Sequence, residues 1–166
     1  MAFIKDFLAG LALMLVVIEP ASSGELSDGL SAYRRGNYST AATKLMPIAA
    51  RGIPEAQTAL GFMYEYGRGV PQDAELAAQW YRCAADQGNA GSLYQLGLMH
   101  DKGHGVPRSA VIAYELLNLA AARARPAERD YYLRMRDAVA VKLNRAQIAH
   151  AQALARAWAP RSGPCR

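Results

Sequence analysis

The sequence predicts an all-α fold: an α/α superhelix, or solenoid, of about three helix-turn-helix repeats with C-terminal capping helices. The first observation is an internal repeat, because placing residues 55–90 on 91–126 gives 11 identities in 36 positions without a gap. Such a period is typical of units that bury their apolar faces only by stacking on their neighbours. The second observation is an abundance of alanine without strand-like runs, which favours closely packed helices.

Residues 1–23 are interpreted as an export signal. Lys5 precedes an apolar run over residues 7–18, and Pro20 then breaks the run ahead of small residues. The run is too short for a comfortable membrane span, which needs about 20 residues. Acidic residues on both sides of the run leave an uncleaved anchor as the alternative. We expect a mature chain from Gly24 that is periplasmic or secreted.

Each unit is expected to contain a helix A, a loop, a helix B and a short turn. The expected helices cover 26–35 and 39–50 in the first unit and 54–66 and 74–87 in the second, the third unit covers 90–123, and capping helices cover 127–143 and 144–158. The expected boundaries are 24–125 for the repeat array, 126–158 for the capping helices and 159–166 for a disordered tail.

Several residues recur at fixed places in the units. Gly61 and Gly97 fall within helix A, where glycine costs about 1 kcal/mol relative to alanine, so we expect helix B to cross there without room for a side chain. The loop 67–71 and its copy supply glycines for a left-handed helix end and a reversal. Asp73 and Ser109 stand at N-cap positions of the B helices.

These residues carry a resemblance to a known family. From Ala56 to Gly88 the chain reads A-x-x-x-L-G-x-M-Y-x-x-G-x-G-V-P-x-D-x-x-x-A-x-x-W-Y-x-x-A-A-x-x-G, which resembles the Sel1-like repeat, a relative of the tetratricopeptide repeat. The resemblance extends over about 26–123. It implies a superhelix whose A helices line the concave side, and a role as a protein-binding scaffold, adaptor or regulator. His100 replaces the usual tyrosine, which puts the shape of the third unit in question.

A partner is expected on the concave face, at helix A residues that differ between the two clear units. The expected protein-binding residues are Thr58, Phe62, Glu65, Tyr94, Leu98 and Asp101. Aromatic side chains tend to dominate such interfaces. The alternative is that Phe62 and Leu98 simply pack on the adjoining repeat. The sequence predicts a monomer and does not identify the partner.

Charge suggests a second function. Residues 24–107 contain 7 basic and 8 acidic residues, whereas residues 108–166 contain 11 and 4. This excess is either a solvated helix face or a surface for an anionic envelope lipid or polysaccharide. Nucleic acid is disfavoured because no basic, aromatic platform is present.

Catalytic and cofactor chemistry has little support. His100, His104 and His150 lack the further ligands and the spacing that zinc needs, so we expect no metal site and no cofactor. The nucleophile and metalloprotease motifs S-x-x-K, G-x-S-x-G and H-E-x-x-H are absent from the sequence, which disfavours an enzyme. Cys83 and Cys165 are compatible with one disulfide in an oxidising compartment.

Overall fold

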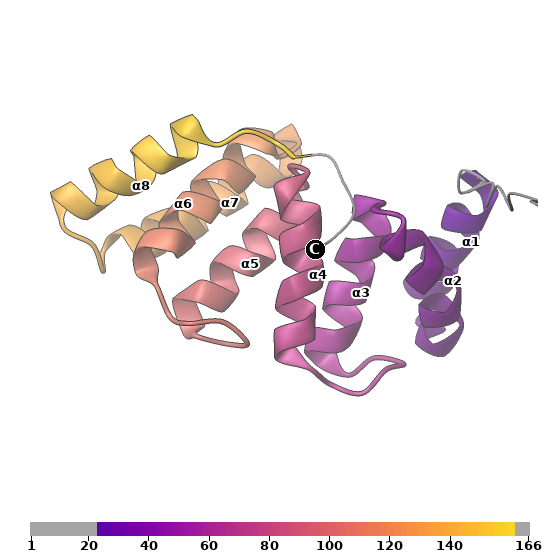
Figure 1. Ribbon diagram of the computed structural model, residues 1–166. Coiled ribbons are helices and arrows are strands. Elements are labelled where there is room, and N and C mark those ends of the chain that lie inside the picture. The colour runs from indigo at the N-terminus through magenta and orange to yellow at the C-terminus, as the bar shows by residue number, and fades with distance from the viewer. Residues whose placement is uncertain (1–22, 162–166) are drawn as a thin grey trace, which may run out of the picture.

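The computed structural model describes residues 23–161, which form eight α-helices and no strand. The helices are α1 (Ser23–Arg34), α2 (Tyr38–Ala50), α3 (Pro54–Tyr66), α4 (Ala74–Asp86), α5 (Ala90–Lys102), α6 (Ala110–Arg123), α7 (Pro126–Ala140) and α8 (Arg145–Ala157). Figure 1 shows them following one another from α1 at one end of the molecule to α8 at the other. The predicted all-helical solenoid is confirmed.

The helices pack as consecutive antiparallel pairs. Each helix from α1 to α6 contacts the next along the chain, and α8 folds back onto α6 and covers the end of the array. Within residues 23–161, no helix combines the length and the apolar character needed to cross a bilayer. Residues 1–22, which hold most of the predicted export signal, lie outside the described residues, as do 162–166 at the end of the predicted tail.

Neighbouring aromatic residues on α4 join successive parts of the core. Trp80 packs against the first cluster, which is built from α1, α2 and α3, whereas Tyr81 is fully buried in the central cluster. Leu116 and Leu117 occupy the same two positions on α6. Leu116 packs against the central cluster and Leu117 lies in the last one. α4 and α6 therefore each join two neighbouring core clusters.

The mid-helix glycines lie where helix B crosses helix A of the same unit. A Cβ added at Gly61 would lie 2.6 Å from ring atoms of Tyr81, and one added at Gly97 would lie 3.0 Å from Cγ of Leu117. Both separations are shorter than ordinary van der Waals contact. The predicted close crossing is confirmed at both positions.

The glycine-rich loops also hold neighbouring units together. Gly67 and Gly103 end their helices in the left-handed conformation, at φ 63° and 73°, as expected. Gly69 and Gly105 also have positive φ, and a Cβ there would collide with the backbone of Tyr38 and of Ala74 respectively. Each loop therefore sits on the first residues of helix B of the preceding unit, an arrangement that local turn chemistry did not reveal.

The helix caps follow the sequence signals. The side chain of Asp73 accepts a hydrogen bond from the backbone N of Leu76 at 2.9 Å, and Ser109 Oγ accepts one from Ile112 at 3.3 Å. Asn144 opens α8 with a complete capping box. These bonds satisfy backbone donors that the first turn of a helix leaves without partners.

Candidate interaction surface

The structure places three of the six predicted binding residues in contacts between units. Thr58 Oγ1 donates to the carbonyl oxygen of Pro54 at 2.7 Å and shares a hydrogen bond with Ser92 Oγ at 2.7 Å, which links α3 to α5. Asp101 forms an ion pair with Lys142 Nζ at 2.6 Å, which links α5 to the turn before α8. Leu98 packs against the last core cluster.

Glu65 is held at the edge of the crossing between α3 and α4. The hydroxyl of Tyr81 donates to Glu65 Oε2 at 2.9 Å. Burial, and then the neighbouring Glu65 carboxylate, raise the pKa of Tyr81 far above its usual value, so the phenol stays protonated and remains a donor. The carboxylate of Glu65 is therefore already engaged within its own unit.

Phe62 and Tyr94 belong to a larger aromatic surface that runs across the A helices. We define the aromatic row as Tyr33, Phe62, Tyr66, Tyr94, Tyr131 and Tyr132. Its members come from α1, α3, α5 and α7, so it spans every repeat unit and the first capping helix. The row therefore draws on side chains from residues 33 to 132.

Ring contacts connect the row in two stretches. Phe62 meets Tyr33 edge-on, with ring centroids 5.6 Å apart, and lies 4.7 Å from the ring of Tyr66. Tyr94 stacks on Tyr132 at 4.8 Å, and its hydroxyl is 2.9 Å from that of Tyr131. Such aromatic pairs add about 0.5–1.5 kcal/mol beyond the burial of their area, so the row is held in place by its own members.

Two members of the row face solvent. Tyr66 is 50% exposed and Tyr131 is 45% exposed. Phe62 and Tyr94 are half-buried beneath them. Neither exposed ring was among the residues predicted from the sequence, although Tyr66 follows Phe62 by four residues and therefore lies on the same helical face.

Four tyrosines of the row are uncharged over the physiological pH range. Burial raises the pKa of Tyr33 to about 12, and burial also raises the pKa of Tyr66, Tyr94 and Tyr132. The hydroxyls of these four tyrosines are therefore protonated and can both donate and accept a hydrogen bond. The guanidinium of Arg134 lies 5.9 Å from the ring centroid of Tyr131 and places positive charge at the end of the row.

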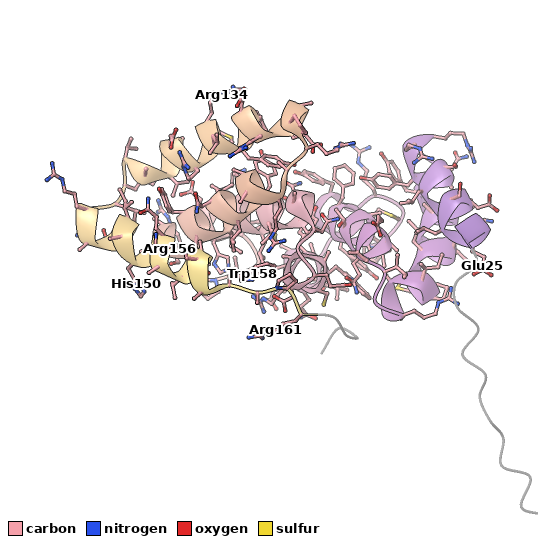
Figure 2. The ribbon with its side chains drawn as sticks, turned by 90° about the horizontal axis from the view of Figure 1, so that it is seen from above. Glu25, Arg134, His150, Arg156, Trp158 and Arg161 are labelled. Carbon is pink, nitrogen blue, oxygen red and sulfur yellow. The ribbon has the colours of Figure 1, made fainter. Side chains whose placement is uncertain are left out.

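The positive excess of the C-terminal part is partly neutralised and spread out. Three ion pairs with N–O distances of 2.6 to 2.7 Å occur here: Arg125–Glu128, Arg136–Asp137 and Lys142–Asp101. Figure 2 shows Arg134 and Arg161 pointing away from opposite sides of the molecule. These cations therefore do not form a single patch.

The histidines have separate surroundings. His100 is 7% exposed, and its Nδ1 lies 3.0 Å from the carbonyl oxygen of Pro107. Because a carbonyl oxygen only accepts, Nδ1 carries the proton and ties α5 to its own loop. His104 is exposed in that loop. Among residues 23–161, no three histidine, cysteine, aspartate or glutamate side chains come together as metal ligands would.

Comparison with protein families identifies the repeated units. The Sel1 repeat family matches residues 54–89 and 90–124, which cover α3 to α6. Residues 54–124 are therefore two Sel1 repeats. The resemblance inferred from the sequence is confirmed for these residues, and the matched segments begin at the first residues of α3 and α5 and end in the turns after α4 and α6. Sel1 repeats generally mediate protein–protein interactions.

Two solved structures extend this relationship beyond the two Sel1 repeats. One is a protective antigen present in uropathogenic Escherichia coli strains, which displays an SLR fold; it has a TM-score of 0.73 and 28% identity over 81% of this chain. The other is a Sel1 repeat protein from Oxalobacter formigenes, with a TM-score of 0.58 and 29% identity over 69% of this chain. The chain spans 29% and 54% of the length of these two proteins.

Proposed function

We propose that this chain is a non-enzymatic scaffold that binds a protein partner along the aromatic row. The observation that supports this most is that α1, α3, α5 and α7 each contribute rings to the two contacting stretches of the row. Tyrosine supplies a large and rigid contact area with a polar tip, and it is enriched at binding hot spots. A stacked array presents such a surface without needing a closed pocket.

The chemistry of the row favours a partner that is recognised by shape and hydrogen bonds. Its tyrosine hydroxyls can donate to and accept from a polypeptide backbone, and the rings of Tyr66 and Tyr131 offer apolar area for side chains. Arg134 adds one cation at the end of the row. Binding should therefore weaken only modestly as salt increases, in contrast to binding through a basic surface.

The predicted export signal at residues 1–23 supports a location in the periplasm or outside the cell. We further propose that the scaffold works there as a monomer. Its partner would then be another envelope or secreted protein.

A cross-linked pull-down from the cell envelope tests this function. The Tyr66→Ala, Tyr131→Ala double variant removes the two exposed rings of the row, and the Val141→Ala, Leu154→Ala double variant removes exposed apolar groups elsewhere. We expect the first variant to lose most of the partner recovered by wild type, and the second to retain it. Equal recovery by both variants would contradict the proposal.

Repeating the pull-down at low and high salt distinguishes partner binding along the row from the alternative function. Binding to an anionic lipid or polysaccharide through the basic C-terminal helices would fall steeply with ionic strength and would survive loss of the two tyrosines. Partner binding through the row should persist at about 0.5 M salt, where the Debye length is below about 5 Å.

A further inference from the structure

The chain returns to the middle of the array after its last helix. We define the strap as residues 158–161, which leave α8 and run to the C-terminal end of α4 (Figure 1). There the backbone N of Arg161 donates to the carbonyl oxygen of Asp86 at 2.7 Å. The strap therefore connects the capping helix α8 to the second unit, and it passes the third unit on the way.

A tryptophan anchors the start of the strap. The guanidinium carbon of Arg123, at the end of α6, lies 4.2 Å from the ring centroid of Trp158. The same guanidinium borders the turn at Gly88, where an added Cβ would lie 3.1 Å from its Nη1. Trp158 also packs against the central core cluster. The strap thus occupies a defined site made by α4, α6 and the turn after α4.

A disulfide-bonded cysteine lies beside the place where the strap ends. Cys83 is disulfide-bonded and precedes Asp86 on α4 by three residues, which is about 4.5 Å along a helix axis. Cys165 is the other cysteine of the chain, four residues beyond Arg161, and lies outside the described residues. Four residues of extended chain reach about 13 Å, which is enough to return from Asp86 to Cys83.

We propose that the strap is a redox-dependent clamp, closed by a disulfide between Cys83 and Cys165. The bond would fix the strap on α4 and hold α8 to the second unit as well as to α6. Without it, the end of the strap keeps one backbone hydrogen bond and its tryptophan keeps one cation–π contact, both near the surface. Reduction would then free the strap from α4 and expose its docking site to another chain.

The redox step needs a dithiol reductant. One thiolate of the dithiol attacks the bond between Cys83 and Cys165 and releases one cysteine thiolate. The second thiolate of the dithiol then displaces the other cysteine and closes a disulfide within the reductant. Two electrons pass to the clamp, and two protons complete the two cysteine thiols. In an oxidising compartment the closed state is the expected one.

Peptide mapping tests the bond itself. Trypsin, used without reductant on the full chain, should yield peptide 83–102 joined to peptide 162–166. A single mass for this pair that disappears with dithiothreitol, from protein that runs as a monomer on a non-reducing gel, is the expected result. Free thiols at both cysteines, or a bond between two copies of the chain, would overturn the proposal.

Amide hydrogen exchange tests the clamp. We expect the Arg161 amide, which the oxidised protein protects through Asp86, to exchange at least about tenfold faster after reduction or in Cys165→Ser, while α1 to α3 stay unchanged. Cys83→Ser should match Cys165→Ser, which keeps the test valid if one variant folds poorly. Equal exchange at Arg161 in the oxidised and reduced protein would show that the disulfide does not hold the strap.

Discussion

The ring of Tyr81 on α4 lies directly over the backbone of Gly61 on α3, at a distance that leaves no space for a methyl group. The third unit has the same crossing with a smaller partner, because Leu117 lies over Gly97 there. The two crossings therefore differ in how far the overlying side chain can move to make room for a methyl group. A rigid aromatic ring fixed by its hydrogen bond to Glu65 cannot move aside as a leucine can.

The first prediction follows from this difference. Gly61→Ala should destabilise the protein by about 2 kcal/mol, because overpacking against Tyr81 outweighs the gain in helix propensity. Gly97→Ala should change stability by less than about 1 kcal/mol, because Leu117 can shift by a few tenths of an ångström. Urea unfolding of both variants measures this, and a larger loss for Gly97→Ala would contradict the reason given.

A double variant checks the cause of the loss. Tyr81→Leu copies the leucine found in the third unit and should relieve most of the penalty of Gly61→Ala. The free energies of the two changes should therefore be non-additive by about 1 kcal/mol or more. Additive losses would show that the crossing is not what constrains Gly61.

The second prediction concerns the contact between the loop of the third unit and α4. Gly105→Ala combines a strained φ of 67° with a collision against the backbone of Ala74, so it should cost about 3 kcal/mol. Gly91→Ala is the control, because a Cβ there meets only the side chain of Asn89 at 3.4 Å. It should be neutral or stabilising by up to about 1 kcal/mol in thermal or urea unfolding. Similar losses for the two variants would argue against the proposed stacking of the loop on the preceding unit.

The third prediction concerns pH. Burial, and secondarily the charge of Arg82, lower the pKa of His100, although its hydrogen bond to Pro107 acts the other way. The unfolded chain, with a histidine pKa of about 6.5, therefore binds the proton more readily than the folded protein. Neutral His100 therefore makes its full contribution to the free energy of unfolding above about pH 6.5. This contribution is lost as the pH falls from there toward the pKa of His100 in the folded protein.

The check compares wild type with His100→Tyr, which restores the residue found at the matching position of the second unit. The urea midpoint should fall further between pH 7.5 and pH 5 for wild type than for the variant. Tyr64 shows that the fold accepts tyrosine at this place in helix A. Equal falls in the two proteins would mean that His100 does not contribute to the acid sensitivity.

Sequence reasoning predicted well those features that depend on local backbone chemistry. The repeat revealed the two crossing glycines, the left-handed helix ends and the N-caps, because each needs a particular residue at a particular position. The loop stacking was missed, since the reason for Gly105 lies in the backbone of Ala74, in another unit.

The interaction surface was harder to predict, since variation between units did not distinguish exposed residues from those that join the units. Thr58 bonds to Ser92, 34 residues away, and Asp101 pairs with Lys142, 41 residues away. Neither partner could be found from helical spacing. Tyr131 was missed for a related reason, because it lies on α7, beyond the segment in which the repeat can be aligned.

Site-specific photo-cross-linking tests whether the aromatic row binds a protein partner. A photoreactive phenylalanine analogue placed at Tyr66 or Tyr131 keeps an aromatic ring at an exposed position of the row, and the same analogue at Val141 or Leu154 samples exposed positions away from it. We expect one partner protein to be captured in the envelope from both row positions and from neither control. Capture from the control positions alone, or no capture from the row by a normally folded protein, would contradict partner binding along the row.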